Sequence, residues 1–240
     1  MDEIAISSFW VYFASEPLLW LVLTLATFLC AQWISRKAGG TPLLHPVVVT
    51  MALLIGLLLL TDTDYDTYFD GAQFIHFLLG PATVALAVPV YDQLPLIRRL
   101  LLPVVGACLT GTLVAASSAV GITLLLGGSE ELVRAIAPKS VTSPIALGIA
   151  EQIGGQPSLA AGLVLVTGVI GCQLAPLVFR LLGQQDPAVQ GFTLGLAAHG
   201  FGTAWAFQMS AMAGAFAGLA MALTGVFSSV LVPVVVGLVL

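Results

Sequence analysis

The first group of residues that could do chemistry lies in one short segment, Pro138 to Pro144. Lys139 lies there between a proline and a run of hydroxyl side chains, and apolar stretches flank the segment on both sides. A charged side chain at the centre of a bilayer costs about 3 kcal/mol or more unless it is paired or hydrated. Lys139 therefore either snorkels to the membrane interface or lines a polar cavity.

The cavity interpretation predicts an anion site. Ser140, Thr142 and Ser143 would supply hydroxyl groups beside the Lys139 ammonium. A half-helix that begins near Pro144 would add the partial positive charge of its N-terminus. Together these groups suit a small anion such as a carboxylate.

Glu151 is the acid on the same segment. It either pairs with Lys139 or marks the wet end of the segment. We favour the second interpretation, which leaves the lysine free for a ligand.

A second candidate cluster is the run from His199 to Thr203. Gly200 and Gly202 allow close backbone approach, His199 offers a titratable donor or acceptor, and Thr203 offers a hydroxyl. Helix packing is the alternative, because small residues pack membrane helices together. We favour a site, since His, Gly and Thr occur together in one break.

No enzyme or metal motif accompanies these clusters. The sequence has no Ser-His-Asp arrangement in a GxSxG context, no phosphate-binding glycine loop and no HExxH. His45 and His76 are isolated in apolar runs and are expected to be core residues. The three cysteines are isolated too, so we expect packing roles for them. We predict no catalytic residue, no metal and no cofactor, and therefore not an enzyme.

Composition sets the class of protein. Of 240 residues, 59% are hydrophobic and 8% are charged, whereas soluble domains carry about 25% charged residues. The chain cannot cover a water-facing surface, so its partner is the lipid bilayer. No basic cluster offers a footprint for nucleic acid. Four of the acids lie between Asp62 and Asp70, which we predict to be one solvated loop.

The predicted fold is all-α, a polytopic integral membrane protein with about eight hydrophobic segments. A spanning helix needs about 20 mostly apolar residues. Five stretches meet this requirement: Leu18–Ile34, Leu43–Leu60, Leu100–Leu126, Ser158–Leu182 and Ala211–Leu240. The first should stay as a span, because residues 1–16 contain acids but no Lys or Arg and so do not form a signal peptide.

Three further stretches are apolar but interrupted: Gly71–Tyr91, Leu132–Ile153 and Gly191–Met209. Each should break where its Pro or Gly residues cluster, because proline removes a backbone donor and glycine costs about 1 kcal/mol inside a helix. Broken backbone at membrane depth is tolerated only where protein covers it or water lines it. Three breaks alternating with intact spans favour a cavity over simple kinks.

Positive charge predicts the orientation. Arg36-Lys37, Arg98-Arg99 and Arg180 all reach the cytoplasm if the N-terminus lies outside. Under this topology Gly71–Tyr91 crosses inward, and Leu132–Ile153 dips into the membrane and returns to the outside.

The same topology predicts an internal inverted repeat, in which residues 43–126 and 158–240 each run span, broken segment, span, in opposite senses. A parallel repeat is the alternative, because residues 83–93 (TVALAVPVYDQ) faintly echo residues 142–152 (TSPIALGIAEQ). The sequence does not decide between the two.

Three motifs resemble the signatures of a known family, the LrgB/CidB family. They are residues 80–91 (GPATVALAVPVY), which include Thr83, residues 138–146 (PKSVTSPIA) and residues 199–204 (HGFGTA). The resemblance covers residues 41–240, so we divide the chain into an N-terminal segment with the first span, 1–40, and a family domain, 41–240. Thr83 joins Lys139 and its hydroxyl neighbours, and the 199–203 cluster, as a predicted substrate-binding residue.

Two departures from the family pattern stand out. The third signature usually continues with Arg or Lys, where this chain has Trp205, and the last span usually carries a Ser near Gly214, where this chain has Phe216-Ala217. If the basic residue helps to bind substrate, selectivity differs here.

The resemblance implies two functions. One is transport of small 2-hydroxy or 2-keto carboxylates of the pyruvate, glycolate and glycerate class, since plastid relatives look like glycolate/glycerate translocators. The other is antiholin-like modulation of murein hydrolases and autolysis. Both imply a bacterial inner (cytoplasmic) membrane location and a small LrgA/CidA-type membrane partner. We favour transport, because three broken helices and an intramembrane lysine are costly for a scaffold. The substrate, the coupling ion and whether the chain forms a homo-oligomer stay open.

Overall fold

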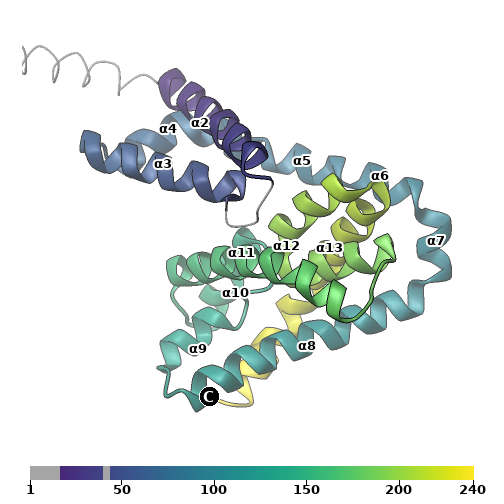
Figure 1. Ribbon diagram of the computed structural model, residues 1–240. Helices are drawn as coiled ribbons and strands as arrows, with labels where there is room; N and C mark the ends of the chain where they lie inside the picture. Colours follow the sequence, from purple (N-terminus) through teal and green to yellow (C-terminus); the bar gives the residue numbers. More distant parts are fainter. Residues whose placement is uncertain (1–16, 40–43) are drawn as a thin grey trace, which may run out of the picture. The chain divides into compact units, whose positions relative to one another are not determined.

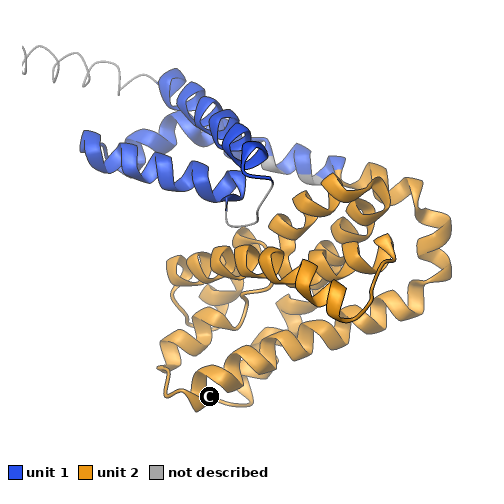
Figure 2. Cartoon of the chain, in the orientation of Figure 1, with its two compact units in different colours: residues 1–85 blue, residues 86–240 orange. Residues whose placement is uncertain are grey.

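The computed structural model describes residues 17–39 and 44–240 (Figure 1), and in these residues all regular structure is helical. The predicted all-α membrane class is confirmed: five stretches are long and apolar enough to cross a membrane. They are Pro17–Lys37, Tyr65–Asp92, Leu101–Leu125, Pro157–Leu181 and Ala211–Gly237. The chain divides into two compact units, residues 1–85 and 86–240 (Figure 2), which are described separately. The predicted domain boundary at residues 40–41 lies outside the described residues.

Unit 1 contains α2 (Pro17–Lys37), α3 (Pro46–Thr61), α4 (Tyr65–Phe77) and α5 (Leu79–Ala85). Helix α2 packs against both α3 and α4. The fully buried Trp20 ring meets Tyr68 edge to face, with centroids 5.7 Å apart. Gly71 lets α4 approach the backbone of Pro17, because a side chain there would collide with its carbonyl oxygen. This packing makes unit 1 a helical cluster around one tryptophan.

Two predictions about unit 1 need correction. The expected span Leu43–Leu60 is the 16-residue helix α3, which begins at Pro46 after His45 caps it and ends where Asp62 adopts a left-handed conformation (φ 49°). The predicted acidic loop is wrong from Tyr65 onward, because α4 begins there. Acidic side chains suit the first turn of a helix, where the macrodipole is positive.

The interrupted stretch Gly71–Tyr91 breaks as predicted, into successive short helices. After α4 and α5 come α6 (Ala87–Asp92) and α7 (Leu94–Arg99), with turns at Leu78 and Leu86. Each turn lies three residues before a proline, Pro81 or Pro89, as expected from the clash of proline with the preceding turn.

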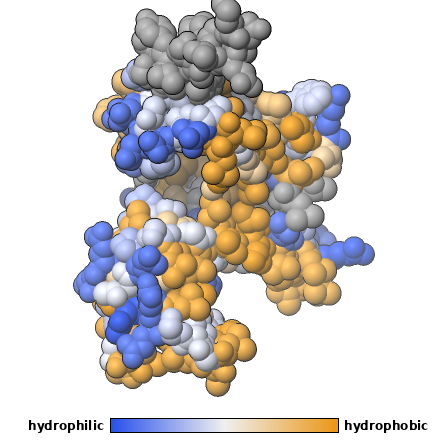
Figure 3. All heavy atoms as spheres, turned by 90° about the vertical axis from the view of Figure 1, so that its left-hand side faces the viewer, coloured by the Kyte–Doolittle hydropathy of each residue, from blue (hydrophilic) through white to orange (hydrophobic). Residues whose placement is uncertain are grey.

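Unit 2 continues with α8 (Leu101–Leu125), α9 (Glu130–Ile136), α10 (Ser143–Gln152), α11 (Pro157–Leu181), α12 (Pro187–Met209) and α13 (Ala211–Gly237). Helices α8 and α13 run parallel. Near the start of α8, Cys108 Sγ lies 3.9 Å from Ala220 O and 3.4 Å from Thr224 Oγ1 of α13. Further along both helices, Val120 and Val232 belong to one buried cluster. Many side chains of the long helices are apolar and exposed, as a lipid-facing surface requires. Hydrophobic side chains fill broad areas of the face shown in Figure 3.

Candidate functional site

The first feature of the site is a broken segment between α8 and α11. Helix α9, capped by Ser129, ends at Ile136, and α10 begins at Ser143, so residues 137–142 are not helical. Across the break, Ala135 and Ala150 meet in one buried cluster. The chain therefore turns back on itself, which agrees with the predicted dip and return. We call residues 130–152 the first hairpin.

A second reversal lies inside α12. Helical geometry is interrupted at His199 alone (φ 39°, ψ −124°), a backbone conformation that non-glycine residues rarely adopt. Beyond it, a side chain at Gly202 would collide with the carbonyl oxygen of Leu194 and lie 2.9 Å from Ala198 Cβ. Residues 200–209 thus fold back along residues 187–198. We call residues 187–209 the second hairpin.

Small residues seat the second hairpin on α13. A side chain at Gly191 would collide with the backbone of Ala213, and one at Gly195 with that of Ala217. The contacting residue numbers increase together in the two helices, so residues 187–198 run parallel to α13. Glycine at four-residue spacing lets membrane helix backbones touch.

The same half of the second hairpin runs antiparallel to α11. Leu194 packs in one cluster with Ala175 and Phe179 of α11, whereas His199, further along, reaches back to Val164. Since α13 is parallel to α8, helices α8 and α11 point in opposite directions. Each is followed by a hairpin, so the two hairpins enter from opposite ends of unit 2.

The two breaks lie at about the same level, measured along the helices from the opposite ends of unit 2. At about 1.5 Å rise per residue, the seven residues of α9 reach about 10 Å inward. By the same rise, residues 187–198 reach about 18 Å from the other end. The sum is close to the roughly 30 Å thickness of a bilayer hydrocarbon core. The breaks can therefore meet inside the membrane.

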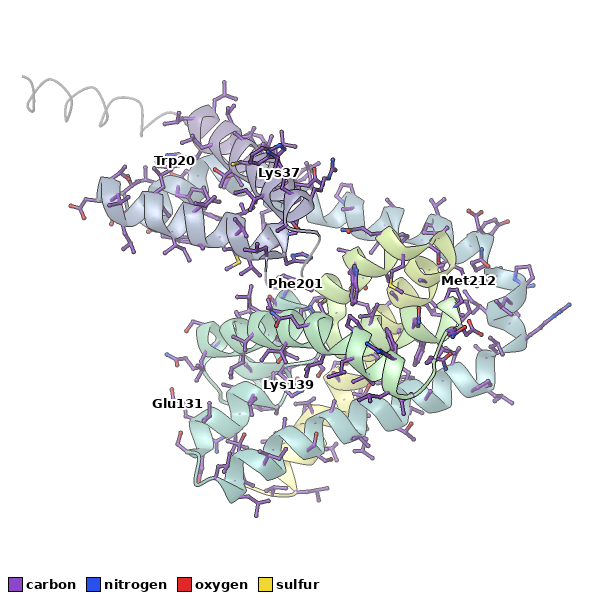
Figure 4. All side chains as sticks on the ribbon, viewed as in Figure 1. Trp20, Lys37, Glu131, Lys139, Phe201 and Met212 are labelled. Atoms are coloured by element: carbon purple, nitrogen blue, oxygen red, sulfur yellow. The ribbon has the colours of Figure 1, made fainter. Side chains whose placement is uncertain are left out.

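The two breaks are linked through Val164 of α11. His199 Nε2 lies 3.0 Å from the backbone oxygen of Val164, and because a carbonyl only accepts, Nε2 carries the donated hydrogen. Val164 packs in the same buried cluster as Val141 from the first break. Figure 4 labels Lys139 of the first hairpin and Phe201 of the second.

Lys139 is half-buried in the first break, where its Nζ donates a hydrogen bond to Ser140 Oγ over 3.2 Å. Among the described residues, the ion pair found joins Arg134 to Glu130, and no carboxylate comes within 4.0 Å of Lys139. Glu151 is exposed, as expected for a residue at the wet end of the segment. The lysine charge is therefore left for solvent or a ligand to neutralise.

The other predicted residues of the first hairpin surround this charge. Thr142 is the N-cap residue of α10 but makes no capping hydrogen bond with its side chain, and Ser143 is the first residue of the helix. Both are partly exposed, whereas Ser140 is buried. The break thus combines one cation, three hydroxyls and the N-terminus of α10.

The predicted residues of the second hairpin divide into two groups. Thr203 is buried, and its hydroxyl donates to the backbone oxygen of His199 over 2.8 Å, so it closes the turn. Gly202 is a packing glycine. Gly200 has nothing within 4 Å of the position of a Cβ, so it faces open space beside the turn. The side chain of Thr83 lies outside the described part of the chain.

The prediction that both remaining histidines are core residues is wrong for His76, which is exposed, whereas His45 is half-buried. His45 Nδ1 accepts from Val47 N at the start of α3 over 3.3 Å. His76 is exposed and meets Phe69 edge to face. In the described residues no group of three His, Cys, Asp or Glu side chains is placed to hold a metal ion.

Fold and site together define a class: a polytopic helical membrane protein in which two helical hairpins enter from opposite ends of unit 2 and are linked through Val164, beside a half-buried polar break. A family model described as the LrgB-like family matches residues 24–238. The chain therefore belongs to the LrgB-like family, as the three motifs indicated.

Individual proteins are similar to this chain over most of its length. An uncharacterized protein, YxaC of Bacillus subtilis, is 34% identical over 91% of this chain and 94% of its own length. Another, YwbG of Bacillus subtilis, is 32% identical over 87% and 92%. Holin-like protein CidB of Staphylococcus epidermidis is 29% identical over 92% and 96%. No solved structure matches the chain.

Proposed function

We propose that this protein transports small 2-hydroxy and 2-keto carboxylates, the class of pyruvate, glycolate and glycerate, across a bacterial cytoplasmic membrane. It works with a small LrgA/CidA-type membrane partner and has no catalytic activity of its own. One observation carries the proposal: the half-buried Lys139 has no carboxylate partner within 4.0 Å among the described residues.

The chemistry of the break supports a carboxylate as the missing partner. A lysine charge at this depth is unfavourable by about 3 kcal/mol unless an opposite charge or water stabilises it. Ser140, Thr142 and Ser143 offer hydroxyls beside it, and the N-terminus of α10 adds a favourable dipole. A 2-hydroxy or 2-keto acid presents a carboxylate to the ammonium and a neighbouring oxygen to the hydroxyls.

The arrangement of the hairpins supports transport in particular. In secondary transporters, broken helices from inverted repeats meet near the bilayer midplane and form the substrate site. Here two hairpins enter from opposite ends and are linked through Val164 of α11. The inverted repeat predicted for residues 43–126 and 158–240 begins in unit 1, so it stays a prediction. Within unit 2, α8 with the first hairpin and α11 with the second form a smaller inverted pair.

Control of autolysis is the second candidate function, because relatives carry the name holin-like protein CidB. The two candidates differ in a measurable way. A carrier saturates with substrate and is competed by analogues, whereas a lysis modulator need do neither.

The test is uptake of labelled pyruvate, glycolate and lactate into proteoliposomes, with the partner present and absent. We expect saturable uptake that unlabelled analogues compete. If purified protein with its partner shows no saturable flux, while loss of the gene still alters autolysis in cells, the transport proposal is wrong and the second candidate stands.

A further inference from the structure

A cavity of about 370 Å³ lies far from the Lys139 break, at the base of the second hairpin. It is formed by the C-terminal end of α11, the loop that follows, and the two ends of α12. Its volume is at the low end of the range of about 300–1,000 Å³ for small-molecule sites. Along α11, Arg180 of the cavity is 16 residues from Val164, or about 24 Å at 1.5 Å per residue. This cavity is therefore separate from the site already described.

The polar lining of the cavity is one cation and three amides: Arg180, Gln184, Gln185 and Gln190. No carboxylate occurs among its described lining residues. The nearest acid in sequence, Asp186, uses Oδ1 to accept from Ala188 N at the start of α12, over 2.8 Å. The lining therefore carries a net positive charge.

Hydrogen bonds orient two of these amides. Gln184 Oε1 accepts from Asp186 N over 2.9 Å, so its NH₂ end is left to donate elsewhere. Gln190 Nε2 donates to the Gln184 backbone oxygen over 2.8 Å, which ties α12 to the loop. Gly183 (φ 63°) ends α11, and Gln184 N donates to Phe179 O over 2.8 Å. The wall of the cavity is thus held by its own backbone and amide bonds.

The inner wall is aromatic. Trp205 and Phe179 line the cavity and pack in the buried cluster with Ala175, Leu194 and Ala206. Trp205, Arg180 and Gln184 all line this cavity. An indole together with a guanidinium and an amide donor suits a small organic anion, because such an anion carries a carboxylate for the polar groups and a short carbon chain for the ring. A guanidinium binds a carboxylate through two parallel hydrogen bonds.

We propose that this cavity is a second anion site, which binds a small 2-hydroxy or 2-keto carboxylate between Arg180, Gln184 and Trp205. It takes its ligand class from the proposed function, but its occupancy does not depend on Lys139. In the transport cycle it concentrates substrate at the Arg180 end of the protein, the end at which the second hairpin enters.

The test uses the fluorescence of Trp205 in the full-length protein in lipid nanodiscs. Iodide quenches exposed tryptophans, and the part due to Trp205 is the difference between the parent and Trp205→Phe. Glycolate is the probe, and its neutral amide, glycolamide, is the control. We expect glycolate to shield Trp205 from iodide and glycolamide to have no effect. The shielding should be lost in Arg180→Gln and kept in Lys139→Ala.

Two results would overturn the site: no shielding by glycolate in the parent, or equal shielding in Arg180→Gln. If Trp205→Phe does not fold, equilibrium binding of radiolabelled glycolate to Lys139→Ala is compared with binding to the Lys139→Ala/Arg180→Gln double variant; equal binding by the two would also overturn it. If uptake is saturable but glycolate does not shield Trp205, the second anion site is wrong and the proposed transport function stands. If glycolate shields Trp205 but uptake is not saturable, the proposed transport function is wrong and the anion site stands.

Discussion

The two hairpins of unit 2 make opposite use of a break in a membrane helix. The first opens six residues, 137–142, and places a cation and hydroxyl groups in the gap. The second reverses at a single residue, His199, and its hydroxyl, on Thr203, bonds to the backbone of the same turn. The first hairpin therefore has polar groups left for a ligand, whereas the second satisfies its own.

The two hairpins therefore have different expected roles: the first contacts the substrate, and the second positions the helices around it. Small residues hold the second hairpin against α13 and against its own returning half. Its tip in turn contacts Val164, which packs with the first break. Substitutions in the first hairpin should therefore change substrate affinity, and those in the second should change stability.

The largest effect is expected at Lys139. Lys139→Ala should reduce carboxylate uptake to the background of empty liposomes while the protein still folds, because the only cation in the break is lost. Lys139→Arg should keep part of the activity, since a planar guanidinium does not replace a compact ammonium. The measurement is initial uptake rate in proteoliposomes at matched protein content. Parental kinetics in both variants would mean that Lys139 only snorkels.

The glycines of the second hairpin allow a matched comparison. Gly202→Ala should destabilise the protein by about 1–3 kcal/mol, because the added methyl group meets the Leu194 carbonyl and has no space. Gly200→Ala should be close to neutral, since its surroundings are open. Thermal unfolding of the purified proteins, followed by tryptophan fluorescence in one detergent, measures both. A lower midpoint for Gly200→Ala than for Gly202→Ala would contradict the folded-back geometry.

Substitution of one threonine in each hairpin tests these different roles directly. Thr142→Val keeps shape but removes a hydroxyl that makes no capping bond, so it should raise the KM for uptake. A lost interaction of about 1.4 kcal/mol corresponds to a tenfold change if KM follows binding. Thr203→Val should leave KM unchanged, because that hydroxyl already bonds to His199 O. A rise in KM for Thr203→Val alone would reverse the assignment of the two hairpins.

The smallest effect is expected in the pH profile of His199→Gln. The His199 ring is buried and its Nε2 donates to Val164 O, which makes it a latch for the turn. We therefore expect a less stable protein whose uptake depends on pH as the parent's does. A changed pH profile, measured in proteoliposomes at fixed substrate gradient, would instead place His199 in a proton-coupled step.

Much of the architecture could be predicted from the sequence. Hydrophobic runs, prolines and glycines identified the membrane class and all three interrupted segments, because these signals act within a few residues of where they stand. Pro138 lies near the start of the first break and Pro144 in the first turn of the helix that follows it, for this reason. The same local signals failed for the acidic run after Asp64, where a helix begins instead of a loop. Acidic residues serve both loops and first turns, and composition does not distinguish them.

What the sequence determined by itself was the kind of chemistry: a lysine among hydroxyls inside an apolar segment. Only the tertiary structure decided which residues share that site. It brought His199 to Val164, turned Thr203 inward as a structural group, and gathered Arg180, Gln184 and Trp205 around a separate cavity. The physical reason is distance along the chain. Local propensity places a break, but the direction of the chain after it depends on backbone contacts such as Gly195 with Ala217, which form only when the helices pack.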